Sequence, residues 1–157
     1  MILHVRDFAE LSVDELYGIL RLRSEVFVVE QDSVYLDPDG FDQKAVHVWF
    51  EEGGRIEAYA RVLPAGATFD TPAVGRIIAR RRGVGLGTRI MEEAIAVAED
   101  RFGAEEIRIE AQIQAEPFYR RFGFVRISDE FDDGGIPHVV MSRRRIGRRC
   151  GPPTSTL

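Results

Sequence analysis

The sequence contains a single cysteine, Cys150, so no disulfide can form within one chain. This cysteine usage is typical of a reducing compartment, and we expect a cytoplasmic protein. No apolar run approaches the roughly 20 residues that a membrane span needs. The opening residues, MILHVRDFAEL, lack the basic segment and the small-residue cleavage site of a signal peptide. We therefore expect no association with a membrane.

Histidine is scarce, and lysine is almost absent. The histidines at positions 4, 47 and 138 do not have the spacing of metal ligands, so we expect no metal site. The formal net charge is −5, and the five arginines from residue 143 onward leave −10 for the rest of the chain. An acidic body argues against a broad nucleic-acid-binding face. It also makes the arginines at 80, 81 and 82 a local attractor for an anion.

Length and the order of apolar segments favour one domain with a mixed sheet. We assign residues 1–143 to a single domain and residues 144–157 to a basic C-terminal tail that contains Pro, Ser and Thr. Ser12 and Glu15 form a capping box, which predicts the start of a helix. We expect strands at residues 2–8, 45–50, 56–63, 73–79, 107–112, 124–128 and 138–142, and helices at 12–29, 86–102 and 116–121. The order β-α-β-β-β-α-β-α-β-β indicates an α/β protein whose mixed α+β sheet contains a parallel βαβ unit at residues 73–112.

The most informative segment is the junction Arg80-Arg81-Arg82-Gly83-Val84-Gly85-Leu86-Gly87-Thr88 between strand 73–79 and helix 86–102. Glycines let backbone N–H groups approach an anion closely, and the start of a helix adds a favourable dipole. A dinucleotide fingerprint would need a third glycine at Thr88, and a Walker A loop would need a lysine near its end. A turn with solvated arginines is the alternative to a phosphate site.

Two motifs resemble the GNAT superfamily of N-acetyltransferases. Arg82-x-x-Gly85-x-Gly87 is similar to its pyrophosphate loop, Q/R-x-x-G-x-G/A. Gln112-x-x-Ala115-x-x-Phe118-Tyr119-x-x-x-Gly123-Phe124 is similar to N-x-x-A-x-x-[LF]-Y-x-x-x-G-F, with glutamine at the asparagine position. The resemblance implies the GNAT acyl-CoA N-acyltransferase fold and acetyl-coenzyme A as cosubstrate. It places the coenzyme against these residues: Ile77, Ile78, Ala79, Arg82, Gly83, Val84, Gly85, Leu86, Gly87, Thr88, Gln112, Phe118 and Tyr119.

The resemblance also implies that Tyr119 lies near the coenzyme sulfur and acts as general acid. A phenol with a pKa near 10 can protonate a departing thiolate, whose pKa is near 8.5, without a large driving-force penalty. The alternative is a core tyrosine at the end of a helix.

A closer resemblance, to the ElaA-like branch of the superfamily, covers residues 8 to about 143. It is carried by these segments: 22–31 (LRSEVFVVEQ), 37–42 (DPDGFD), 58–61 (AYAR), 75–76 (GR) and 133–138 (DGGIPH). The branch often has Cys-Pro where this chain has Ser33-Val34, and it usually reads E-D-G-I-P-H where this chain has Asp133 to His138. These differences leave the exact geometry of both loops open.

Acetyl transfer to an amine requires loss of a proton, because an alkylammonium with a pKa near 10.4 is almost wholly protonated at pH 7. The candidate bases are Glu110, His47 and His138, and Glu110 shares a strand face with Gln112. A solvated carboxylate or a structural histidine is the competing interpretation for each. A backbone N–H around Ile78 is the candidate oxyanion donor. We expect the acceptor to contact the following residues: Arg23, Glu25, Phe27, His47, Arg76 and His138.

The acceptor wall predicted from the first helix and the loop after it is rich in acids. It carries Glu25, Glu30, Asp32, Asp37, Asp39 and Asp42, with few cations nearby in the sequence. An acidic pocket mouth concentrates cations, so we expect a small, cationic primary amine as acceptor, bound by a monomer or a homodimer. Turn-capping aspartates are the competing interpretation. Two other functions stay open: a catalytically silent acyl-CoA-binding module, and a nucleotide-binding βαβ domain with Glu110 as ribose ligand.

Overall fold

The computed structural model describes residues 1–145, and its centre is a mixed sheet of eight strands. Along the sheet the order is β1-β2-β3-β4-β5-β8-β6, and β7 pairs with β8 outside this path. Only the β4–β5 pair is parallel. The strands are β1 (Ile2–Asp7), β2 (Val46–Glu52), β3 (Arg55–Leu63), β4 (Ala73–Ala79), β5 (Glu106–Gln112), β6 (Val125–Arg126), β7 (Phe131–Asp133) and β8 (Ile136–Arg144).

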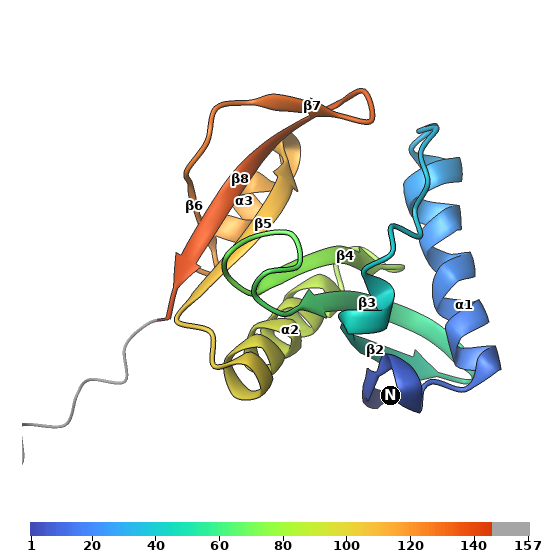
Figure 1. The fold of residues 1–157 in the computed structure, drawn as a ribbon. Helices are drawn as coiled ribbons and strands as arrows, with labels where there is room; N and C mark the ends of the chain where they lie inside the picture. The colour runs from blue at the N-terminus through green and yellow to red at the C-terminus, as the bar shows by residue number, and fades with distance from the viewer. Residues whose placement is uncertain (146–157) are drawn as a thin grey trace, which may run out of the picture.

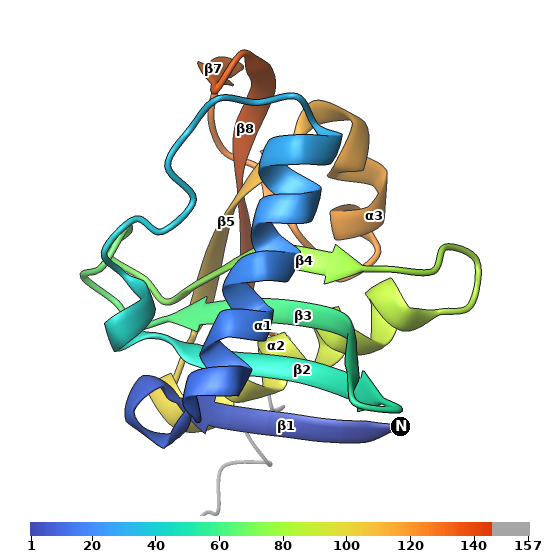
Figure 2. The same ribbon diagram turned by 90° about the vertical axis from the view of Figure 1, so that its right-hand side faces the viewer.

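Helices cover both faces of the β1–β4 half of the sheet. Figures 1 and 2 show α1 on one face and α2 on the opposite face, with α3 beside β5. The α-helices are α1 (Val13–Arg23), α2 (Leu86–Phe102) and α3 (Glu116–Arg120), and a π-helix, η2 (Ser24–Glu30), continues α1. Short 3₁₀ turns are η1 (Phe8–Glu10), η3 (Asp42–Lys44) and η4 (Ile113–Ala115). No helix within residues 1–145 is long and apolar enough to cross a membrane.

Local sequence explains where the two long helices begin and end. The Ser12 side chain accepts the Glu15 N–H at 3.0 Å, and the Glu15 carboxylate accepts the Ser12 N–H at 2.8 Å, which confirms the predicted capping box. Gly85 and Gly103 flank α2 in the left-handed conformation, which glycine adopts without a Cβ penalty. Gly85, which belongs to the glycine-rich segment 83–87, is therefore also the residue at which α2 starts.

Strands β2 and β3 alternate between two cores. Val48 and Ala60 face α2, whereas Trp49 and Tyr59 face Ile19 of α1, and all five side chains are buried. Each large apolar side chain fully removed from water contributes roughly 1.5–3 kcal/mol to stability. Packing on both faces holds β3 and β4 in place, and β4 forms one wall of the site.

A bulge interrupts the alternation in β4. Tyr59 and Arg61 are two residues apart on β3, but their partners Ile78 and Gly75 are three apart on β4. Val74 consequently packs in the α2 core and Ile78 in the α1 core, although unbroken alternation would put both on one face. Arg76 occupies the bulge with φ of +52°, in the left-handed region.

The predicted mixed sheet is confirmed, and three local expectations were wrong. The helix expected over residues 12–29 changes to π-helix at Ser24. The strand expected at 124–128 is confined to Val125–Arg126, and β7 was not predicted. Except for its first two residues, the predicted tail 144–157, with Cys150, lies outside the described residues.

Candidate active site

Strands β4 and β5 separate from each other and open a cavity of about 800 Å³. The parallel pairing holds only at Ala73–Arg108, so the rest of the β4 edge has no partner strand. Figure 1 shows the two halves of the sheet diverging from this point. Ten residues expected at the site line the cavity: Phe27, Arg76, Ile77, Ile78, Ala79, Arg82, Glu110, Gln112, Tyr119 and His138.

The glycine-rich loop forms the start of α2 at one end of the cavity. Gly83 and Gly85 have φ of +76° and +77°, a region that other residues rarely adopt. No side chain caps this helix, and the first N–H groups of an α-helix have no partner within it. Such a helix start attracts anions through its N–H groups and its dipole. The loop can therefore receive a diphosphate, as the resemblance implies.

Only one of the three consecutive arginines is free for a ligand. Arg80 donates from Nε to the Ile56 carbonyl oxygen at 2.6 Å, and Arg81 forms an ion pair with Glu52 at 3.0 Å. Arg82 lines the cavity and makes no ion pair with any residue in the described part of the chain. Arg82 is thus the cation of this loop available to a phosphate.

Backbone N–H groups of β4 point into the gap. The Arg80 N–H donates to the Glu57 carbonyl oxygen on the β3 side at 2.9 Å. Because N–H groups alternate between the two sides of a regular strand, the N–H of Ile78 also points to β3, and that of Ala79 points away from it. The candidate oxyanion donor, expected around Ile78, is therefore the N–H of Ala79 rather than that of Ile78 itself.

Tyr119 extends from α3 into the cavity. Its ring packs edge-on against Phe118 and Phe124, and its hydroxyl makes no hydrogen bond within residues 1–145. Burial raises the pKa of Tyr119 to about 12. The phenol is therefore a weaker acid than the sequence analysis assumed, but it stays protonated and can donate a hydrogen bond at any physiological pH.

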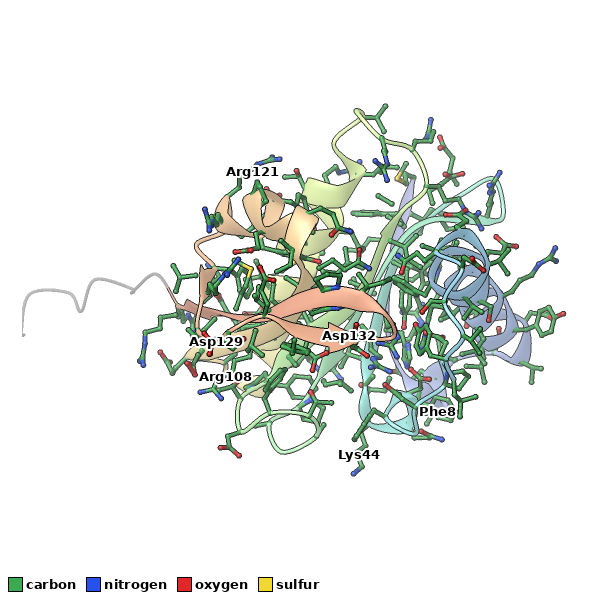
Figure 3. All side chains as sticks on the ribbon, turned by 90° about the horizontal axis from the view of Figure 1, so that it is seen from above. Phe8, Lys44, Arg108, Arg121, Asp129 and Asp132 are labelled. Atoms are coloured by element: carbon green, nitrogen blue, oxygen red, sulfur yellow. The ribbon has the colours of Figure 1, made fainter. Side chains whose placement is uncertain are left out.

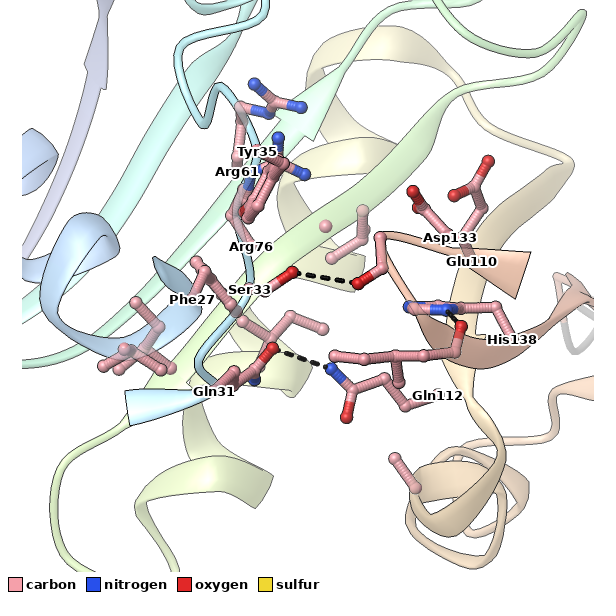
Figure 4. Close-up of a pocket in the computed structure, with 18 of the residues that line it drawn as sticks. Phe27, Gln31, Ser33, Tyr35, Arg61, Arg76, Glu110, Gln112, Asp133 and His138 are labelled. Atoms are coloured by element: carbon pink, nitrogen blue, oxygen red, sulfur yellow. Dashed lines mark hydrogen bonds between the residues drawn. The ribbon is translucent and has the colours of Figure 1, made fainter. Parts of the chain in front are cut away.

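Glu110 and Asp133 are neighbouring carboxyl groups on the opposite wall of the cavity from Arg76 (Figure 4). Partial loss of water at the cavity wall and the adjacent Asp133 carboxylate raise the pKa of Glu110, although both residues are still exposed. A higher pKa makes a carboxylate a better proton acceptor, which suits the role expected for Glu110.

His138 lies below this pair in Figure 4. Its Nδ1 is 2.7 Å from the Ile136 carbonyl oxygen, which can only accept, so Nδ1 carries the hydrogen. The neutral ring then has its lone pair on Nε2. His138 can accept a proton or a hydrogen bond from a ligand, so it stays a second candidate base.

Arg23 and His47 do not reach the cavity. Arg23 is 0% exposed and donates to the carboxylates of Asp37 at 2.8 Å and Asp42 at 2.6 Å. His47, also 0% exposed, lies 2.7 Å from the Tyr59 hydroxyl and 2.9 Å from the Asp42 carbonyl oxygen. Burial lowers the pKa of His47, so it stays neutral and structural. The expectation that either side chain contacts the acceptor is not supported by this placement.

Part of the acidic segment is neutralised by arginines, which weakens the argument for a cationic acceptor. Three of its carboxylates form one network with three arginines from α1, β3 and β4: Asp37, Asp39 and Asp42 with Arg23, Arg61 and Arg76. Glu25 of the same wall is 3.5 Å from Arg80 and does not line the cavity. The sequence analysis missed these partners because Arg61 and Arg76 lie far along the chain. Carboxylates that line the cavity without an ion pair within residues 1–145 are Glu30, Glu110 and Asp133.

The loop after η2 bridges the two walls of the cavity. Gln112 Nε2 donates to Gln31 Oε1 at 3.2 Å, and the Ser33 hydroxyl donates to the Gly134 carbonyl oxygen at 3.1 Å (Figure 4). Sequence reasoning did not assign Gln31, Ser33 or Asp133 to the site. The only signal for Gln31 and Asp133 was membership in the segments that resemble the ElaA-like branch, and Ser33 stands where this chain departs from that branch.

The remaining loop residues lie beyond the cavity lining. Gly87 contacts the Phe118 ring, with 3.6 Å from an added Cβ to Cε2, and Leu86 is buried in the core. The Thr88 hydroxyl accepts a hydrogen bond from Arg121 at 3.1 Å. Gly83, Val84 and Gly85 are exposed at the loop, where a ligand could approach from solvent.

Comparisons with known proteins identify the family. The family model described as an acetyltransferase (GNAT) domain matches residues 24–145. Protein ElaA of Escherichia coli is 33% identical over 142 residues, covering 88% of this chain and 93% of the relative. The UPF0039 protein sll0451 of Synechocystis is 34% identical over 137 residues, covering 85% and 89%.

Solved structures with high TM-scores belong to the same kind of protein. The crystal structure of Escherichia coli ElaA superimposes with a TM-score of 0.85 at 31% identity, covering 91% of this chain and 99% of that one. An acyl-CoA N-acyltransferase from Pseudomonas aeruginosa also gives a TM-score of 0.85, at 32% identity and the same coverage. Fold and site together define an N-acyltransferase of the kind that uses acyl-coenzyme A. The chain belongs to the acetyltransferase (GNAT) family, in which it is an ElaA-like protein.

Proposed function

We propose that this protein transfers an acetyl group from acetyl-coenzyme A to a primary amine of a small molecule. The observation that carries the proposal is the β4–β5 gap, which has an anion-binding helix start at one end and the Tyr119 hydroxyl inside it. The diphosphate would bind at Gly83–Gly87 and Arg82, and the unpaired β4 edge would hold the extended arm that leads to the thioester.

The amine must reach the thioester as a neutral nucleophile. Glu110 takes one proton from the ammonium, and the nitrogen then attacks the thioester carbon. The C–N bond forms, the C–S bond breaks, and the nitrogen releases its second proton to water as the amide forms. The N–H of Ala79 donates to the carbonyl oxygen while negative charge develops on it.

Tyr119 assists departure of the sulfur as a hydrogen-bond donor. Its pKa of about 12 lies above the thiol value of roughly 8.5, so complete proton transfer to the thiolate would be uphill by roughly 5 kcal/mol. A hydrogen bond from the phenol to the developing thiolate carries no such penalty. The thiolate can then take its proton from water or from the protonated Glu110.

The acceptor is drawn to the Glu110 side of the cavity. Glu110 and Asp133 are free of ion pairs within residues 1–145, whereas Arg61 and Arg76 on the facing wall are paired. Glu30, which also lines the cavity, adds a third carboxylate without an ion pair in that part of the chain. This charge distribution favours a primary amine that carries no carboxylate beside the reacting nitrogen.

A thiol-release assay with acetyl-CoA and a panel of primary amines tests the proposal, with mass spectrometry to identify the acetylated product. We expect at least one amine to raise thiol release above the rate in its absence. Glu110→Gln should lower kcat/KM for that amine about 10²-fold or more, with little change in acetyl-CoA affinity. If no amine is acetylated although acetyl-CoA binds, the chain is a binding module and the proposal is wrong.

A further inference from the structure

Asp133 has no structural task in the hairpin that carries it. It ends β7, opposite Ile136, and the turn between them is Gly134-Gly135. The preceding residue, Asp132, stabilises that turn, since its carboxylate accepts the Gly135 N–H at 2.8 Å. Asp132 is labelled on this hairpin in Figure 3. Asp133 instead lines the cavity, where it forms no ion pair within residues 1–145 and its carboxyl group lies against that of Glu110.

The strand register brings Asp133 and Glu110 to the same face. On β8, residues 136, 138 and 140 share one face of the sheet, because side chains alternate along a strand. Ile136 pairs with Asp133 on β7, and Val140 pairs with Glu110 on β5. Paired residues point to the same side of a sheet. Figure 4 accordingly shows both carboxyl groups side by side, above His138.

The other groups that face Glu110, Arg76 and His138, offset this like charge only in part. Arg76, from β4, already donates to Asp37 at 2.8 Å and 3.1 Å and to Asp39 at 3.3 Å. His138, from β8, donates from Nδ1 to a backbone carbonyl. In its neutral form it presents a lone pair to the cavity. Glu110 therefore faces one unpaired carboxylate at close range.

We propose that Asp133 is a positioning residue for the transfer reaction: its carboxylate, placed beside Glu110, makes Glu110 a stronger proton acceptor for the incoming ammonium. This inference rests on the proposed function. The step breaks one N–H bond of the ammonium and forms one O–H bond on Glu110, which turns an ion pair into a neutral amine and a neutral acid. A neighbouring negative charge favours that change, because it disfavours the ionised form of Glu110.

The test compares Asp133→Asn with Asp132→Asn. Each removes one negative charge from the same hairpin, and asparagine at 132 can still accept the Gly135 N–H. We measure kcat/KM against pH with acetyl-CoA and the best amine of the panel. Asp133→Asn should move the acidic limb of the profile to lower pH and lower the plateau several-fold. Asp132→Asn should leave both within about twofold. The inference would be overturned if the acidic limb of the kcat/KM profile of Asp133→Asn stayed at the wild-type pH, or if both substitutions had equal effects.

Thermal unfolding gives a readout that needs no acceptor. A carboxyl whose pKa is raised in the folded state stabilises that state while protonated, and this contribution is lost as pH rises through the folded pKa. Asp133→Asn should therefore raise Tm relative to the wild type more at pH 8 than at pH 4, and Asp132→Asn should not. Equal Tm differences at both pH values would show that the carboxylates do not interact. This result is independent of turnover, so it separates failure of the pair from failure of the proposed function.

Discussion

Replacing Arg23 with methionine should destabilise the protein by roughly 3–5 kcal/mol, the usual result of removing one partner of a buried ion pair. The guanidinium is fully buried and donates to the carboxylates of Asp37 and Asp42 and to the Asp37 carbonyl oxygen at 3.2 Å. Asp37 is itself only 2% exposed. Methionine replaces the aliphatic part of the side chain but leaves Asp37 with Arg76 alone, and Asp42 with Arg61 alone, as ion-pair partner.

Urea unfolding measures this loss, and Arg21→Met is the matched control. Arg21 lies one half-turn earlier in α1 and pairs with Glu25 at 3.2 Å, with both side chains well exposed. An exposed pair of this kind contributes about 0.3–0.5 kcal/mol. Acetyl-CoA affinity of Arg23→Met should stay near wild type, because the network lies away from the glycine-rich loop.

The outcome separates two roles for Arg23. A loss below about 1 kcal/mol would refute the argument from burial. A large rise in KM for the amine without loss of stability would instead restore Arg23 as an acceptor-binding residue.

Three further predictions concern the loop, the acid and the ion network. Gly85→Ala should destabilise the protein by about 1–2 kcal/mol and weaken acetyl-CoA binding, because the φ of Gly85 is +77°. Gly87→Ala should be tolerated, because its Cβ would meet the Phe118 ring at an ordinary 3.6 Å. Thermal unfolding measures the stability of both variants, and calorimetry measures their acetyl-CoA affinity. Tyr119→Phe should lower kcat about 10²-fold with acetyl-CoA affinity nearly unchanged, as measured by thiol release and calorimetry. Burial alone would raise the pKa of Asp39, but the hydrogen bonds from Arg61 lower it to about 2. Its stabilising contribution is present above about pH 4 and lost as pH falls toward 2, so Asp39→Asn should flatten the unfolding free energy over that range.

The sequence predicted those parts of the fold that depend on neighbouring residues. The Ser12 capping box and the glycines that precede α2 are local signals, and both appear in the structure. Tyr119 and Gln112 were found through a contiguous motif, and both line the cavity. Such features need no knowledge of how distant segments pair.

Features that depend on pairing between distant segments were not predicted. The segment AVGRIIA of β4 reads as a regular strand, and only its register with β3 shows the bulge at Arg76. The charge of the acidic loop was misjudged for the same reason, because Asp37 and Arg76 are 39 residues apart. Asp133 was not predicted as a site residue, because only the pairing of β8 with both β5 and β7 brings it beside Glu110.

Titration of acetyl-CoA into the wild type and into Gly85→Glu, by calorimetry at two salt concentrations, tests the central claim most directly. The claim is that the helix start beside the β4–β5 gap holds the diphosphate of the coenzyme. It predicts binding to the wild type that weakens as salt rises, and no binding to a folded Gly85→Glu, whose carboxylate would face the phosphates. Unchanged affinity in folded Gly85→Glu, or no binding to the wild type, would contradict it.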